Sequence, residues 1–133
     1  MKEPFGYTVM ADAFDCAPGS CDDLELHYRF LEQLVDALGM TKMTTPFVVH
    51  APRTQGVELF PDKAGCSGWI GLIESGIQIH SIEPTHFMTL DVYSCKTFSW
   101  KTVQKLVEDF FMPKNVYVTG PVARGVGEYT PRK

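Results

Sequence analysis

Three strand-like runs follow one another between residues 68 and 95, and this close succession constrains the fold more than any other feature. The runs are "GWIGLIE", "IQIHSI" and "HFMTLDVYSC", and the breaks between them fall at Ser75-Gly76 and Glu83-Pro84. A period of two is typical of strands with one buried face, and Gly and Pro mark turns. The pattern therefore predicts an antiparallel meander.

A helical pattern occupies residues 22–38, where apolar residues recur every three or four positions. Ser20 with Asp23 resembles a capping box, and Gly39 stands where a helix ends. Ser99 caps a second helix, which Pro113 stops.

Three more strands are expected at "YTVMADAFDC", "MTTPFVVH" and "NVYVTG", and Pro46 predicts that the second of these begins there or lies at an edge. Residues 51–67 read as a long loop, and the tail after Gly120 as irregular. The order β-α-β-β-β-β-α-β implies an α+β fold: a two-layer sandwich, with an antiparallel sheet and two helices on one face. We expect residues 1–133 to form a single domain.

Composition and net charge indicate which kinds of molecule the protein is expected to bind. Hydrophobic residues are 44%, charged residues are 21% and the net charge is −4, which is typical of a globular protein without a basic surface for nucleic acid or membrane. No apolar run approaches the about 20 residues of a membrane span. The four cysteines lack metal-binding spacing, so we expect free thiols, no metal, cytoplasmic residence and a small-molecule partner.

The strands of the meander each combine an apolar face with a chemically active one. Ile77 and Ile79 point one way and Gln78 and His80 the other, and the next run places Asp91, Tyr93 and Cys95 on one face. A lone histidine on such a face is more often only exposed to solvent, without a functional role. A serine hydrolase is a poor alternative, because "IESGI" is not a nucleophile elbow.

The motif "ESGIQIHS", followed by "LDVYSC" with its cysteine fifteen residues after the histidine, resembles the prokaryotic S-adenosylmethionine decarboxylase family. The family pattern is E-S-H-x-x-I-H-T-W-P-E followed by V-D-V-F-T-C. "VMADAFDC" and "SWKTVQKLVEDFFMPKNVYVTG" resemble the family's opening and closing segments, so the resemblance covers about residues 5 to 125.

The resemblance implies a homodimeric enzyme that makes its own cofactor. Ser75 attacks the Glu74 carbonyl, the chain splits between Glu74 and Ser75, and Ser75 becomes a pyruvoyl group, with no pyridoxal phosphate and no metal. Ser67 and His80 correspond to the residues that assist self-cleavage, and Cys95 to the thiol that returns a proton to the substrate. Gly76 is expected to make the strained turn accessible, and that turn must also reorient Ser75, since the Ser75–His80 spacing is odd.

The sequence departs from the family pattern at two positions, one that bears on self-processing and one that bears on substrate recognition. Gly76 replaces the family's histidine, which motivates an alternative: an unprocessed, non-catalytic partner of an active homologue. Pro84 replaces the glutamate that holds the ribose hydroxyls, which motivates another: a pyruvoyl-dependent arginine or ornithine decarboxylase. Substrate contacts are then expected from three acidic candidates in or near the loop: Glu83, Glu58 and Asp62.

Overall fold

The computed structural model describes residues 3–127, which form a six-stranded sheet, a two-stranded sheet and two α-helices. The strands are β1 (Gly6–Phe14), β2 (Phe47–His50), β3 (Arg53–Thr54), β4 (Val57–Glu58), β5 (Gly65–Leu72), β6 (Ser75–Ile82), β7 (Phe87–Ser94) and β8 (Asn115–Arg124). The helices are α1 (Leu24–Ala37) and α2 (Trp100–Phe111), with short 3₁₀ turns η1 (Ser20–Asp22) and η2 (Pro61–Lys63).

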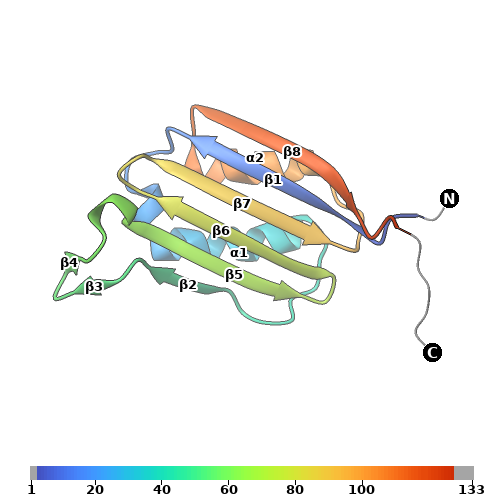
Figure 1. Ribbon diagram of the computed structural model, residues 1–133, viewed down its shortest axis with the longest axis horizontal. Coiled ribbons are helices and arrows are strands. Elements are labelled where there is room, and N and C mark those ends of the chain that lie inside the picture. Colours follow the sequence, from blue (N-terminus) through green and yellow to red (C-terminus); the bar gives the residue numbers. More distant parts are fainter. Residues whose placement is uncertain (1–2, 128–133) are drawn as a thin grey trace.

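The six-stranded sheet is antiparallel throughout and has the spatial order β2-β5-β6-β7-β1-β8 (Figure 1). Its strands β5, β6 and β7 are neighbours in sequence and in space, which confirms the predicted meander. β1 lies between β7 and β8, so the two ends of the described chain meet at one side of the sheet. β2 is the opposite edge strand, as Pro46 indicated.

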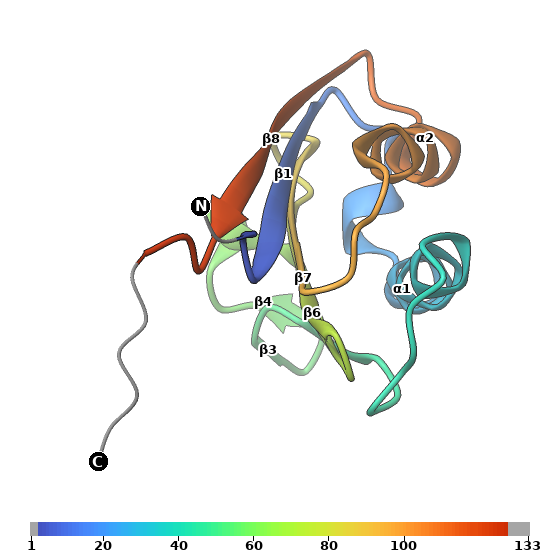
Figure 2. The ribbon, with the colours of Figure 1, turned by 90° about the vertical axis from the view of Figure 1, so that its right-hand side faces the viewer.

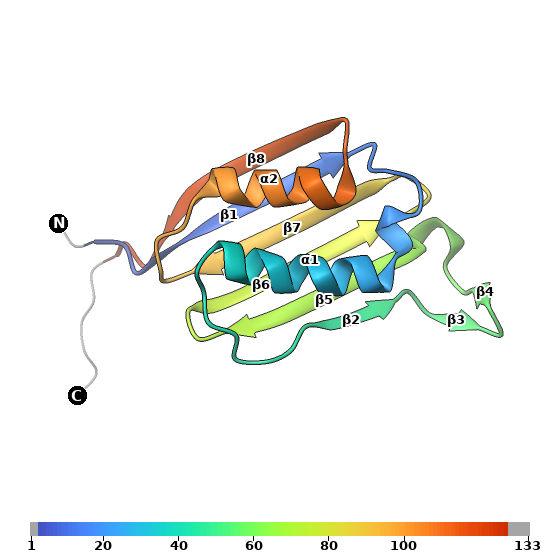
Figure 3. The same cartoon turned by 180° about the vertical axis from the view of Figure 1, so that it is seen from behind.

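Both α-helices lie on the same face of the sheet (Figures 2 and 3), which confirms the α+β two-layer sandwich. The core between the layers contains the apolar residues of alternate strand positions, such as Ile79 and Leu90. Phe30 of α1 packs edge-to-face against Phe110 and Phe111 of α2, with ring centroids 5.5 and 5.3 Å apart. Burying a side chain of this size contributes about 1.5–3 kcal/mol.

The first helix begins later than its periodicity predicted. Residues 20–22 form η1, and the N-cap of α1 is Asp23, whose side chain accepts a hydrogen bond of 3.0 Å from the Leu26 amide. The expected capping box with Ser20 is therefore wrong, because the Ser20 hydroxyl donates to the Ala17 carbonyl within the preceding turn. Gly39, with a φ of 67°, follows the helix as expected.

The second helix has the predicted cap, since the Ser99 side chain accepts a hydrogen bond from the Thr102 amide. Two segments expected to be irregular contain strands. The 51–67 loop holds the β3–β4 hairpin, and β5 begins within it at Gly65. The tail after Gly120 continues β8 as far as Arg124, because pairing with β1 overrides the Gly-Pro signal.

The sheet face turned away from the helices is here called the open face (Figure 1). Strand alternation places on it the side chains of Phe47, Val49, Ser67, Trp69, Gln78, His80, Thr89, Asp91, Tyr93 and Tyr117. Phe47 and Tyr117 are each 63% exposed and Trp69 is 41% exposed, so the open face presents apolar as well as polar groups. Within residues 3–127, neither helix has the length and apolar character of a membrane span.

Candidate active site

The turn between β5 and β6 contains the peptide bond that joins Glu74 to Ser75. Leu72 pairs with Ser75 in the ladder, so only Ile73 and Glu74 lie between the strands. Ser75 has a φ of 153°, which L-residues rarely adopt, and its backbone is therefore strained. The sequence reasoning assigned this unusual conformation to Gly76, but the positive φ falls on Ser75 itself.

Two hydrogen bonds hold Glu74 in place, one to its side chain and one to its backbone carbonyl. Its side-chain Oε1 accepts a hydrogen bond of 2.9 Å from the Thr41 amide, and this bond lowers the pKa of the Glu74 carboxyl below its ordinary value. Its carbonyl oxygen accepts a hydrogen bond of 2.9 Å from the Cys95 amide. The peptide bond before Ser75 thus has a fixed orientation, with a backbone donor already in contact with its carbonyl.

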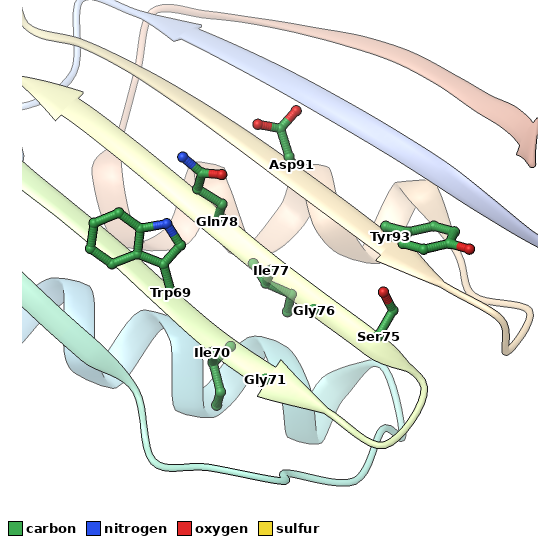
Figure 4. Close-up of a pocket in the computed structure, with 9 residues that line it drawn as sticks. All are labelled: Trp69, Ile70, Gly71, Ser75, Gly76, Ile77, Gln78, Asp91 and Tyr93. Atoms are coloured by element: carbon green, nitrogen blue, oxygen red, sulfur yellow. The ribbon is translucent and has the colours of Figure 1, made fainter.

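A cavity of about 400 Å³ adjoins Ser75 on the open face. Residues of β5, β6 and β7 line it: Trp69, Ile70, Gly71, Ser75, Gly76, Ile77, Gln78, Asp91 and Tyr93. Figure 4 shows the Ser75 hydroxyl directed toward the side of Tyr93, with Trp69, Gln78 and Asp91 farther along the same face. The strand geometry therefore places the serine oxygen at one end of a cavity with aromatic and polar walls.

Asp91 is the acidic group of this cavity. It pairs with Gln78 across β6 and β7. Burial raises the pKa of its carboxyl above the ordinary value, and the nearby charge of Asp12 raises it further. Two residues farther along β7, the ring of Tyr93 is covered by the Arg124 guanidinium, which lies 4.8 Å from the ring centre.

Ser67 and His80 are cross-strand partners on β5 and β6. Ser67 Oγ and His80 Nδ1 lie 2.9 Å apart, within hydrogen-bonding distance. The structure therefore brings together the two residues that the resemblance implicates in self-cleavage. Their contact follows from antiparallel register, which the sequence alone did not show.

The Ser67–His80 pair and the Ser75 turn are separate within one chain. His80 lies five positions after Ser75 in β6, and a strand rises about 3.3 Å per residue, so about 16 Å separates them along the strand. Cys95, by contrast, directly contacts Glu74 through its amide. One chain thus assembles Glu74, Ser75 and Cys95 at one place and Ser67 with His80 at another.

The three acidic candidates for substrate binding lie away from the Ser75 turn in the same chain. Glu83 follows the far end of β6, and its carboxylate accepts hydrogen bonds from the Gly19 and Cys21 amides at 2.8 and 3.1 Å. Glu58 is ion-paired with Arg53 in the β3–β4 hairpin, and Asp62 lies exposed in η2. Their contact with substrate stays a prediction.

Thr41 and Trp69 are site residues that the sequence reasoning missed. Thr41 comes from the segment after α1, more than thirty positions from Glu74, and carries no local motif. Trp69 stands in a run whose residues are apolar at successive positions, so the pattern did not reveal which face it occupies.

Comparisons with known proteins bear on the family and the fold of the chain. The model of the family described as S-adenosylmethionine decarboxylase matches residues 7–124. Among solved structures, the chain is similar to the adenosylmethionine decarboxylase from Aquifex aeolicus VF5, with a TM-score of 0.75 and 22% identity over 99% of this chain and 100% of that one. A comparison with curated proteins found no match. The structural likeness shows the shared fold, and the family match over most of the sequence shows that the chain belongs to the S-adenosylmethionine decarboxylase family, whose members are carboxy-lyases.

Proposed function

We propose that this chain is a self-processing, pyruvoyl-dependent decarboxylase of S-adenosylmethionine. It acts in the cytoplasm and supplies the aminopropyl donor for polyamine (spermidine) biosynthesis. The observation that carries the proposal is the Glu74–Ser75 peptide. The backbone of Ser75 is strained, the Glu74 carbonyl already accepts a hydrogen bond from the Cys95 amide, and a cavity opens beside the Ser75 hydroxyl.

Self-cleavage begins when Ser75 Oγ bonds to the Glu74 carbonyl carbon and the C–N bond between the two residues breaks, leaving an ester. Loss of the Ser75 Cα proton then expels the Glu74 carboxylate from Cβ. Water replaces the remaining nitrogen, which leaves as ammonia, and residue 75 becomes a pyruvoyl group. The Cys95 amide stabilises the oxyanion of the first step, a contribution typically worth 10²–10³ in rate.

The described residues fit a pyruvoyl group at this position, because the strained Ser75 begins a strand whose open face is hollowed beside it. The pyruvoyl carbonyl supplies the electron sink that amino-acid decarboxylation needs and that side chains lack. Trp69 and Tyr93 offer aromatic faces to an adenine ring, and Asp91 offers a carboxylate to the sulfonium charge. The Cys95 thiol returns a proton to the substrate Cα after carbon dioxide leaves.

The active protein is proposed to be a homodimer. The Ser67–His80 pair lies too far along β6 to act on Ser75 of its own chain, and the open face carries exposed Phe47, Trp69 and Tyr117. A two-fold axis through this face makes the contact self-complementary and covers these side chains. In that arrangement the partner subunit's His80 transfers the proton during cleavage at Ser75.

A pyruvoyl-dependent arginine or ornithine decarboxylase is the second candidate. Pro84 has no side-chain acceptor for a ribose, and both oxygens of Glu83 are engaged by backbone amides. These observations remove the nearest replacements for a ribose-binding carboxylate. Asp91 then faces the cationic end of the shorter substrate.

Denaturing intact mass of fresh and incubated protein tests the processing step. We expect fragments of residues 1–74 and 75–133, with the second blocked by a carbonyl that reacts with hydroxylamine. An unbroken chain of 14.9 kDa throughout would overturn self-processing and favour the third candidate, an unprocessed partner of an active homologue. Release of carbon dioxide from carboxyl-labelled S-adenosylmethionine, arginine and ornithine then decides among the substrates.

A further inference from the structure

A second group of chemically active side chains lies at the end of the sheet remote from Ser75. Asp22 of η1, His50 of β2 and Cys66 of β5 each offer a donor atom, and these atoms all lie within 4.8 Å of one another. His50 and Cys66 are cross-strand partners where β5 begins, whereas Ser75 pairs with Leu72 where β5 ends. The cluster is therefore distinct from the candidate active site.

Tertiary contacts hold the three side chains in place. His50 Nε2 donates a hydrogen bond of 2.8 Å to the Asp22 carbonyl and lies 3.6 Å from the Asp22 carboxylate. Cys66 is 2% exposed, so its sulfur is shielded from solvent, while Asp22 and His50 are half-buried and give access from one side. Shielded sulfur with accessible nitrogen and oxygen is an arrangement that a metal ion can enter.

The charged side chains beside this cluster have a net negative charge, which favours binding of a cation. The Arg53 guanidinium donates to both oxygens of the Asp22 carboxylate at 2.7 Å and also pairs with Glu58. The other Glu58 oxygen, Oε2, is buried and has no hydrogen-bond partner among the residues that the structure describes. Two carboxylates therefore share one arginine. With Cys66 as a thiolate, three negative charges are present, those of Asp22, Glu58 and Cys66. Arg53 and a divalent ion together supply three positive charges, so these groups have no net charge.

We propose that Asp22, His50 and Cys66 bind one zinc ion, with water in the fourth position. Oxygen, nitrogen and sulfur donors together favour Zn²⁺ and exclude Mg²⁺ and Ca²⁺, which prefer oxygen alone. A carboxylate has about four lone-pair positions, so Asp22 binds the ion through one oxygen while Arg53 continues to orient the other.

Binding forms three metal–ligand bonds, releases the Cys66 thiol proton to solvent and moves the imidazole proton of His50 from Nε2 to Nδ1, which breaks the hydrogen bond from Nε2 to the Asp22 carbonyl. The ion then joins η1, the edge strand β2 and the start of β5, and so fastens both ends of the 51–67 segment to the body of the protein. Cysteine spacing did not reveal the site, because its ligands come from three segments more than fifteen positions apart.

Cobalt titration of the full-length, metal-free chain tests the proposal, since Co²⁺ reports thiolate coordination by a charge-transfer band. We expect the band to saturate at one ion per chain and to vanish on addition of Zn²⁺. Cys66→Ser should abolish it, and His50→Gln should weaken Co²⁺ binding at least about tenfold. Cys95→Ser, which removes the exposed thiol, should leave the titration unchanged.

Absence of the band in the wild-type chain would overturn the proposal, as would a band that survives Cys66→Ser or disappears in Cys95→Ser. Far-ultraviolet circular dichroism confirms that each variant is folded. Independently of the variants, Zn²⁺ should raise the thermal unfolding midpoint of the wild-type chain, and Mg²⁺ should not. No shift with Zn²⁺ would contradict the site. None of these measurements depends on self-processing, so the site and the proposed activity are tested separately.

Discussion

The amide of Cys95 donates a hydrogen bond of 2.9 Å to the carbonyl oxygen of Glu74, the carbonyl that Ser75 attacks in the proposed self-cleavage. In the proposed mechanism, the backbone and the side chain of Cys95 therefore serve different steps: the amide stabilises the oxyanion during cleavage, and the thiol returns a proton during decarboxylation.

Cys95→Ala separates these two steps, because alanine keeps the amide and removes the thiol. We expect the variant to yield the 1–74 and 75–133 fragments, while decarboxylation falls by about 10²–10⁴, the usual contribution of a positioned proton donor. Intact mass and carbon dioxide release measure the two effects. Ser75→Ala is the control that stays uncleaved, and an uncleaved Cys95→Ala chain would show that the thiol itself takes part in processing.

Mixed dimers test whether His80 acts on the other subunit. A His80→Ala chain has an intact Ser75, and a Ser75→Ala chain has an intact His80. We expect neither variant to be processed alone, whereas co-expression should yield cleavage of the His80→Ala chain only. Masses of differently tagged chains give the result. Processing of His80→Ala by itself, or none in the mixture, would contradict action between subunits.

Trp69→Leu probes recognition of the adenine ring. Loss of one stacked aromatic costs about 1–3 kcal/mol. We therefore expect the KM for S-adenosylmethionine to rise about tenfold with little change in kcat. Trp100→Leu is the matched control, since Trp100 begins α2 on the other layer and is 37% exposed. Equal KM values in wild type and Trp69→Leu would exclude Trp69 from the binding site.

Gly76→Ala tests the packing behind the strained serine. A Cβ on Gly76 lies 3.2 Å from the Ile70 carbonyl oxygen, which the β5–β6 ladder holds in place. We expect a loss of about 1 kcal/mol in the free energy of unfolding, together with slower processing. Gly127→Ala is the control, because no atom of the described residues 3–127 lies within 4 Å of its added Cβ. Chemical denaturation that gives the same midpoint for wild type and Gly76→Ala would contradict the contact.

His27 makes stability depend on pH. It is fully buried, its Nδ1–H donates to the Asp23 carbonyl and its Nε2 accepts from the Ser81 hydroxyl, both at 2.7 Å. Burial lowers the pKa of His27 below its ordinary value of 6.5, although the charges of Asp23 and Asp22 oppose this. The unfolded chain therefore binds the proton more readily than the folded one.

Stability should accordingly decrease as pH falls through 6.5 toward the lower pKa of the folded state, by at most about 1.4 kcal/mol per pH unit for one proton. Urea unfolding at pH 7.5, 6.5 and 5.5 measures the slope. His27→Gln should reduce it. An unchanged slope in His27→Gln would assign it to other groups.

Local sequence patterns determined much of this fold, because alternation and helical periodicity depend only on neighbouring residues. The succession of strand-like runs in 68–95 predicted the meander, the period of two in its last two runs predicted the two faces of those strands, and Ser99 predicted the start of α2. The motif around Ser75 indicated the family. Pairing with the distant strand β1 overrode the local signal in β8, whereas η1 and the β3–β4 hairpin are formed by contacts between residues close in sequence.

Tertiary structure alone decided how the site is assembled. Cross-strand register brought Ser67 to His80. The path of the chain after β7 brought Cys95 to Glu74, and the segment after α1 brought Thr41 to the same residue. The positive φ of Ser75 was also decided by the folded chain, since the sequence reasoning placed the strained conformation at Gly76. Contacts of this kind join residues far apart in the chain, and their distances are set by the packing of the whole sheet, which no local pattern encodes.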